Sequence, residues 1–142
     1  MVDPARSAQM ALIKARNTKP ELRVRKALHA TGLRYRLHVS TLPGKPDLVF
    51  PSRRAVVFVH GCFWHRHPGC ANARLPKSRQ HFWLPKLEAN VRRDRKQRRQ
   101  LTRDGWKVFV FWECQTRSRA ELARLASKVR AWRAENGKHQ TL

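Results

Sequence analysis

Acidic residues are scarce in this sequence: Asp and Glu number nine against 32 Lys and Arg, which leaves a formal net charge of +23. A fold has no need of such an excess, because repulsion between like charges destabilises the compact state. The cations are spread along the whole chain rather than gathered on one helix face opposite large apolar residues, which argues against a membrane surface as the partner. The charge therefore predicts a nucleic-acid-binding protein whose affinity falls steeply with salt.

Long apolar runs are also missing. No stretch approaches the roughly 20 apolar residues of a membrane-spanning helix, and the start of the chain, Met1–Pro4, has no apolar signal-peptide core. The sequence contains no internal repeat, low-complexity tract or dividing linker. We therefore expect an intracellular, soluble protein with a basic, flexible arm at residues 1–18 and a single domain at residues 19–142.

Cysteine is limited to Cys62, Cys70 and Cys114, which cannot all pair as disulfides within one chain. The spacing Cys62-x4-His67-x2-Cys70 lets one loop supply three zinc ligands, and Cys114 would tie that loop to a distant strand. Three thiolates and an imidazole close a tetrahedral site, so such a zinc is structural rather than catalytic. The alternative is that Cys62 and Cys114 are small buried hydrophobes.

Apolar patterning predicts the order helix, three strands, helix, strand, helix. Thr18 is the expected cap of the first helix, with Glu21 as its capping-box acid. The expected helices run from Thr18 to Gly32, 81–103 and 120–133, and the expected strands are 33–39, 48–50, 55–59 and 106–112. Strands 48–50 and 55–59 form a central hairpin, and 106–112 is a further buried strand. This order predicts an α/β fold, a mixed β-sheet flanked by helices.

Asp47 follows a turn and opens a buried strand, a position that packing explains poorly. A carboxylate there can hold Mg²⁺, and phosphodiester cleavage needs such a metal; the alternative is a turn aspartate that caps local amides.

The hairpin would bring His60 near Asp47. His60 and His65 can transfer protons near neutral pH, although either one can be a surface histidine, and His65 can be an alternative zinc ligand. Glu21 can orient a histidine or a metal-bound water, or only cap its helix.

Two aromatic pairs, Phe63-Trp64 and Phe82-Trp83, lie in polar, basic surroundings. Large aromatic side chains there can wedge between base pairs, although core filling is their usual role. We assign core filling to Trp106 and Trp112. We predict DNA contact for Phe63 and Trp64, because a metal-bound loop leaves little room for burial.

These motifs, in order along residues 6–133, resemble the very-short-patch repair (Vsr) DNA mismatch endonucleases. The matching segments are Pro20-Glu21, Pro43-Gly44-x-Pro46-Asp47, His60-Gly61-Cys62-Phe63-Trp64-His65, Phe82-Trp83-x-x-Lys86 with Asn90 and Arg93-Asp94, and Gly105-Trp106-x-Val108 with Trp112-Glu113-Cys114. The His60–His65 motif is the most specific of them. The stretch between His67 and Cys70 is one residue longer than the family pattern.

The resemblance implies a restriction-endonuclease-like fold with a structural Zn²⁺ on Cys62, His67, Cys70 and Cys114. It implies Mg²⁺-dependent nicking of double-stranded DNA, 5′ of the T in a T:G mismatch, the product of 5-methylcytosine deamination. It assigns Asp47 and the backbone carbonyl of Val59 as Mg²⁺ ligands. It assigns His65 and His60 to proton transfer and phosphate contact, with Glu21 as support for His65. It assigns Phe63, Trp64 and Trp83 as intercalating aromatics.

The expected protein is a monomer of the bacterial cytoplasm, associated with the nucleoid, and other mismatch-repair proteins are further candidate partners. Two other readings of the sequence stay open. One is a related nuclease that cuts matched DNA, because fold alone does not set substrate. The other is a zinc-stabilised DNA-binding module without catalysis, in which Asp47 and His65 are incidental.

Overall fold

The structure is a computed structural model that describes residues 18–133. The predicted basic arm lies outside the described residues except for Thr18, as does the end of the predicted domain beyond residue 133. Among the described helices, none is long and apolar enough to cross a membrane.

A four-stranded mixed sheet forms the centre of the domain. Its strands, in spatial order, are β1 (Arg36–Leu37), β2 (Leu48–Phe50), β3 (Ala55–His60) and β4 (Lys107–Trp112). The first two pairings are antiparallel, and β3 pairs with β4 in parallel. In the β2–β3 hairpin Leu48 lies opposite Val57, so the predicted central hairpin is confirmed.

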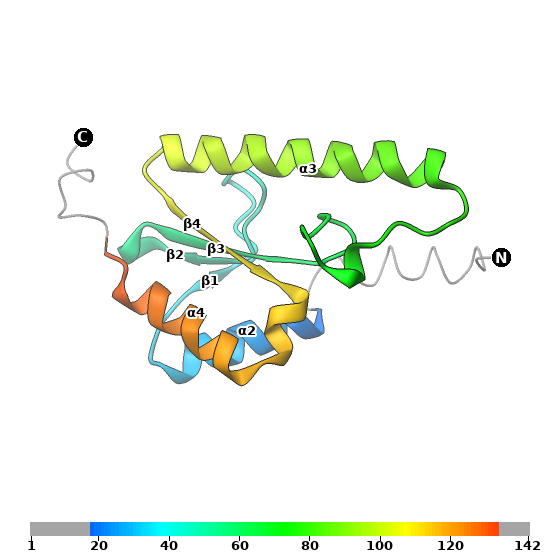
Figure 1. Cartoon of the computed structure of the whole chain (residues 1–142). Coiled ribbons are helices and arrows are strands. Elements are labelled where there is room, and N and C mark those ends of the chain that lie inside the picture. The colour runs from blue at the N-terminus through cyan, green and yellow to red at the C-terminus, as the bar shows by residue number, and fades with distance from the viewer. Residues whose placement is uncertain (1–17, 134–142) are drawn as a thin grey trace.

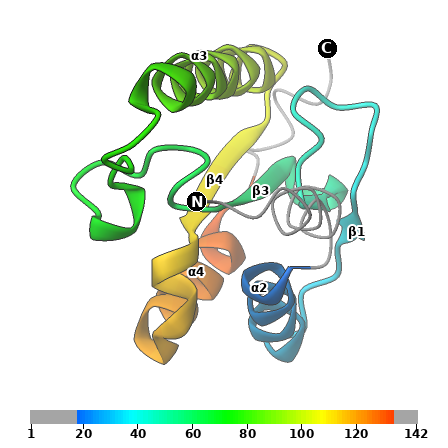
Figure 2. The same cartoon turned by 90° about the vertical axis from the view of Figure 1, so that its right-hand side faces the viewer.

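Within residues 18–133, three α-helices cover the two faces of the sheet. Figures 1 and 2 show α2 (Lys19–Ala30) and α4 (Arg119–Ala131) beneath it and α3 (Gln80–Arg103) across the top. The predicted order of helices and strands and the α/β class are confirmed. Each helix bound differs from the predicted one by no more than two residues, because helix termini fray and their limits follow the local caps.

Each face of β3 contributes to a different part of the core. Val57 packs with the buried side of α2 and α4, including Leu28 and Val129. Val56 and Phe58, which point the other way, pack under α3 with Leu101. This alternation follows from the period of two in a strand. The predicted burial of β3 on both faces is confirmed, and the alternation sends His60 toward the α3 side.

Two strand predictions were wrong in part. The predicted strand 33–39 is reduced to Arg36–Leu37, both exposed, because His38 adopts a left-handed conformation with φ of 50° and ends the extended run. Strand β4 was expected to be buried, yet Phe111 is its only buried residue. Strand β4 forms one edge of the four-stranded sheet. Helix α3 above it buries only Leu87 and Leu101 of the 24 residues of the helix, so β4 is only thinly covered.

Candidate active site and metal centre

The candidate site lies at the end of β3, where chain segments far apart in sequence meet. Asp47 stands just before β2, and its Oδ2 accepts a hydrogen bond of 2.6 Å from the backbone N–H of Val59. This contact confirms that the hairpin brings Asp47 beside the backbone that precedes His60. Burial is the main cause that raises the pKa of Asp47 from 3.8 to about 7, and the nearby carboxylate of Glu21 adds to it.

Glu21 belongs to the Asp47 side of the site. Its backbone N–H donates to the Thr18 hydroxyl, which caps α2 as predicted. Its buried carboxylate accepts a hydrogen bond of 2.6 Å from Arg25 and lies 3.3 Å from Nε2 of His38. The contact with His65 that the resemblance implies for Glu21 is therefore wrong, because the first turn of α2 directs the Glu21 side chain toward Asp47. Glu21, His38 and Asp47 form one group of candidate metal ligands.

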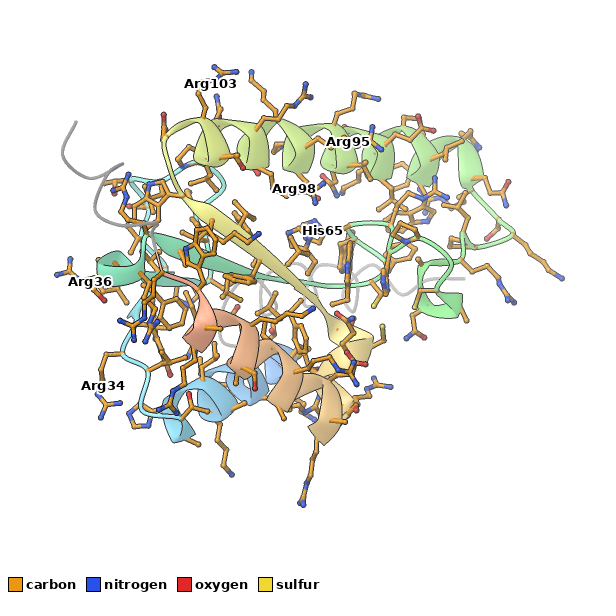
Figure 3. The ribbon with its side chains drawn as sticks, turned by 60° about the vertical axis from the view of Figure 1, so that its left-hand side comes forward. Arg34, Arg36, His65, Arg95, Arg98 and Arg103 are labelled. Atoms are coloured by element: carbon orange, nitrogen blue, oxygen red, sulfur yellow. The ribbon has the colours of Figure 1, made fainter. Side chains whose placement is uncertain are left out.

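The carboxylate on His65 is that of Asp94, from the middle of α3. Nδ1 of His65 and Oδ2 of Asp94 are 2.6 Å apart. The resemblance includes Asp94 but assigns it no role; its one sequence signal is that it is an acid between arginines on the charged part of a helix, which does not show that it reaches His65. Figure 3 shows His65 beneath α3, on the side from which Arg98 projects, while Arg103 points away from the domain.

His60 and His65 stack on each other, with ring centroids 3.9 Å apart and planes inclined by 5°. His60 is buried, and burial, followed by the charge of His65, lowers its pKa from 6.5 to about 3. It is therefore a neutral imidazole at physiological pH. With Asp94, the two histidines form a second group of candidate ligand or proton-transfer atoms, all within 4.8 Å of one another.

The third group unites Cys62, His67, Cys70 and Cys114, whose ligand atoms also lie within 4.8 Å of one another. Nδ1 of His67 is 3.7 Å from the sulfur of Cys62 and 3.4 Å from that of Cys114. Zinc bonds of about 2.3 Å to sulfur and 2.0–2.1 Å to nitrogen give tetrahedral edges of roughly 3.6 Å, which these distances match. The loop selects His67 for this cluster and leaves His65 to Asp94.

The chemistry of this cluster also fits a cation. Burial raises the pKa of the Cys62 thiol from 9.0 to about 12, which makes an unpaired thiolate unfavourable there. A metal ion compensates such a thiolate directly, because it binds the deprotonated form. The loop between His67 and Cys70 turns tightly, and Gly69 in it has φ of 70°.

Trp112 does not fill the core as predicted. Its ring stacks on His67 at 4.3 Å between centroids and meets His60 edge-on at 5.3 Å. It therefore lies between the Cys3His cluster and the histidine pair. The prediction failed because strand residues beside an apolar run read as core in sequence, whereas Trp112 is the last residue of an edge strand.

An aromatic surface formed by Phe63, Trp64, Phe82 and Trp83 lies beside these groups. Trp83 is within 5.8 Å of Trp64 and 5.3 Å of Phe63 between ring centroids, so the loop after β3 and the start of α3 build it together. Trp64 is 36% exposed and Phe82 44%. An apolar cluster that remains this open in a highly charged protein marks an interaction surface.

A cationic groove follows α3 toward its C-terminal end. It is lined by Arg95, Arg98, Arg99 and Arg103 of the helix and by Val108 and Val110 of β4. Because α3 buries so little of its own surface, its arginines stay available to a polyanion. Such a row of guanidinium groups suits the phosphates of a nucleic-acid backbone.

Comparison with known proteins identifies the family. The sequence profile described as "DNA mismatch endonuclease Vsr" matches residues 1–72. The DNA mismatch endonuclease Vsr of Escherichia coli is 40% identical over 129 residues, which cover 89% of this chain and 82% of that protein. The chain belongs to the Vsr family of DNA mismatch endonucleases.

Other relatives of this Vsr-family chain are described as nicking enzymes. The type II nicking enzyme V.XorIIP of Xanthomonas oryzae pv. oryzae is 50% identical over 121 residues, covering 85% of this chain and 86% of that protein. The type II nicking enzyme V.NmeAIP of Neisseria meningitidis is 44% identical over 115 residues, covering 81% of each chain. The predicted resemblance is confirmed, and the chain is a DNA endonuclease.

Proposed function

We propose that this Vsr-family endonuclease nicks one strand of double-stranded DNA, 5′ of the T in a T:G mismatch left by deamination of 5-methylcytosine. The observation that carries the proposal is the convergence at the end of β3. The Asp47 carboxyl, the His65–Asp94 pair and an exposed aromatic surface all meet there. Cleavage chemistry and a surface for probing base stacking thus lie side by side.

Asp47 and the backbone carbonyl of Val59, with Glu21 near Asp47, are proposed to hold Mg²⁺. Two carboxyl groups so close and so buried are costly to ionise together, and this cost is visible in the raised pKa of Asp47. A divalent cation relieves it, so the residues present fit the ion. When bound, such an ion activates water and offsets the charge that develops on phosphorus.

His65 is the proposed proton-transfer residue, with Asp94 as its positioning residue. The Asp94 carboxylate accepts the Nδ1 proton of His65, which fixes the tautomer and leaves Nε2 free to exchange a proton with water or the leaving oxygen. His60 remains neutral and can donate a hydrogen bond to a phosphate oxygen. Its stacking also keeps the ring of His65 in place.

Phe63, Trp64 and Trp83 are proposed to insert beside the mismatch. A mispaired step costs less to unstack than a matched one, so insertion discriminates through the deformation energy of the DNA. The cationic groove along α3 supports the duplex on either side through phosphate contacts. Discrimination and general affinity then come from different parts of the surface.

The remaining features complete the proposal. The Cys3His cluster holds a structural Zn²⁺, and the mixed sheet with helices on both faces is of the restriction-endonuclease-like type. The protein acts as a monomer at the nucleoid of the bacterial cytoplasm, and other mismatch-repair proteins are candidate partners.

The test is a strand-specific nicking assay with Mg²⁺ on labelled duplexes that carry either one T:G pair or a matched pair. We expect nicking of the T strand alone, and of the mismatched duplex alone. Cleavage of both duplexes would favour a nuclease for matched DNA. Binding without cleavage of either duplex would contradict the proposed chemistry.

A further inference from the structure

We infer that His38 joins Glu21 and Asp47 as a ligand of the divalent cation in the cleavage site, and that its imidazole makes this protein prefer Mn²⁺ to Mg²⁺. The inference rests on the proposed function, because it concerns the cation that Asp47 is proposed to bind. One ligand atom from each of the three residues lies within 4.8 Å of those of the other two. That spacing suits three ligands of a single ion.

The backbone places His38 for this role. Its N–H donates to the carbonyl oxygen of Asp47 at 3.3 Å, so the two residues are neighbours across the β1–β2 pair. Its φ of 50° lies in the left-handed region, which is uncommon for residues other than glycine. Strain of this kind persists where the surroundings hold it and is frequent at ligand sites.

The contacts of His38 define which ring atom faces the cluster. Nη2 of Arg25 is 2.9 Å from Nε2 of His38 and 2.6 Å from Oε2 of Glu21. A guanidinium only donates hydrogen bonds, so Nε2 must be the unprotonated nitrogen and present its lone pair. That lone pair is what a neutral imidazole offers to a metal.

Arg25 also shows that the cluster attracts positive charge. Its guanidinium bridges the carboxylate of Glu21 and the imidazole of His38. A divalent cation bound by these two residues and Asp47 competes with the guanidinium for the same atoms. Removal of the arginine charge should therefore strengthen binding of the ion.

The donor set argues for Mn²⁺. Mg²⁺ favours oxygen ligands and keeps several of its waters. Mn²⁺ also suits carboxylates, yet as a transition ion it accepts imidazole nitrogen more readily than Mg²⁺ does. Two carboxylates and one imidazole therefore form a site that binds either ion through oxygen and favours Mn²⁺ through nitrogen.

Direct binding of Mn²⁺ to the full chain, loaded with zinc and free of DNA, tests the inference. The electron paramagnetic resonance signal of free Mn²⁺ gives its affinity, and displacement by Mg²⁺ gives that of the second ion. We expect His38→Gln to weaken Mn²⁺ binding about tenfold or more and Mg²⁺ binding less than twofold. The matched control His29→Gln, at an exposed histidine of α2, should change neither. Arg25→Gln should strengthen Mn²⁺ binding severalfold.

Equal loss of both ions in His38→Gln would assign His38 a structural role and overturn the inference. An unchanged Mn²⁺ affinity in that variant, weaker binding in Arg25→Gln, or no Mn²⁺ binding by the unchanged protein would also overturn it. The Asp47→Asn variant separates the two proposals. If it loses Mn²⁺ while His38→Gln retains it, only the role of His38 is wrong. If it still nicks DNA, the proposed cleavage site itself is wrong.

Discussion

Replacement of Asp47 by Asn should stabilise the magnesium-free protein at alkaline pH while it abolishes nicking. Burial and the Glu21 carboxylate raise the pKa of Asp47 from 3.8 to about 7, so its ionised form is unfavourable in the folded state. A difference of roughly three pKa units limits the gain in the free energy of unfolding of the Asn variant to about 4 kcal/mol. Partial exposure of Asp47 and relaxation of the carboxyl pair lower the expected gain to about 1–2 kcal/mol.

The gain should depend on pH in a defined direction. Between about pH 4 and pH 7 the folded protein binds the Asp47 proton more tightly than the unfolded chain does. The free energy of unfolding of the unchanged protein therefore falls as the pH rises through this window and stays lower above it. The amide of the variant does not titrate. The difference between the two proteins should thus be small at or below pH 4, rise through the window, and be largest at pH 8.

Urea unfolding with zinc present and without magnesium measures this difference. Comparison at each pH removes the contribution of His60, which titrates in both proteins. Asp104→Asn, at an exposed acid that follows α3, is the matched control and should give no pH-dependent gain. A variant at Asp47 that is no more stable than the unchanged protein at pH 8, or a gain that does not grow with pH, would refute the electrostatic account of this site.

Three further predictions concern other parts of the site. Asp94→Asn should lower the single-turnover nicking rate about 100-fold with unchanged DNA affinity, because His65 loses its anionic partner; an unchanged rate would remove Asp94 from the site. Cys114→Ala should lower zinc content and thermal stability, and unchanged metal stoichiometry would remove Cys114 from the ligand set. Trp64→Ala should reduce the preference for a T:G duplex over a matched one about tenfold, since stacking on one base is worth about 1–3 kcal/mol; equal loss of affinity for both duplexes would contradict insertion.

The elements that could be predicted from sequence are those with strong local signals. The β2–β3 hairpin followed from two apolar runs separated by a turn, and α3 from its length and its Asp104-Gly105 end. The grouping of Cys62, His67, Cys70 and Cys114 followed from ligand chemistry and spacing, although spacing alone did not separate His67 from His65.

The contacts that escaped prediction depend on side-chain directions set by the whole fold. Glu21 and Asp94 are both acids on helices, and nothing local shows which of them reaches His65. The answer depends on α3 crossing above the end of β3 while α2 lies on the opposite face (Figures 1 and 2). His38 gave no signal at all, because its position follows from a left-handed backbone turn that its neighbours do not predict.

We propose that the Cys3His cluster has a geometric part in cleavage, as the holder of a structural metal. Strand alternation sends His60 toward α3, but His65 comes five residues later in a loop without regular support. Ordering each free loop residue costs roughly 1–2 kcal/mol of conformational entropy. The stacking of His60 on His65 and one contact with Asp94 are too weak to offset this cost for the whole segment. Cys62 and His67 bracket His65 and lie in one cluster with Cys114, which follows β4. A metal on this cluster therefore sets the distance between the two histidines, and it fixes Phe63 and Trp64 in the same loop. Loss of the metal should therefore disturb proton transfer and mismatch discrimination together, because one short segment carries the residues for both.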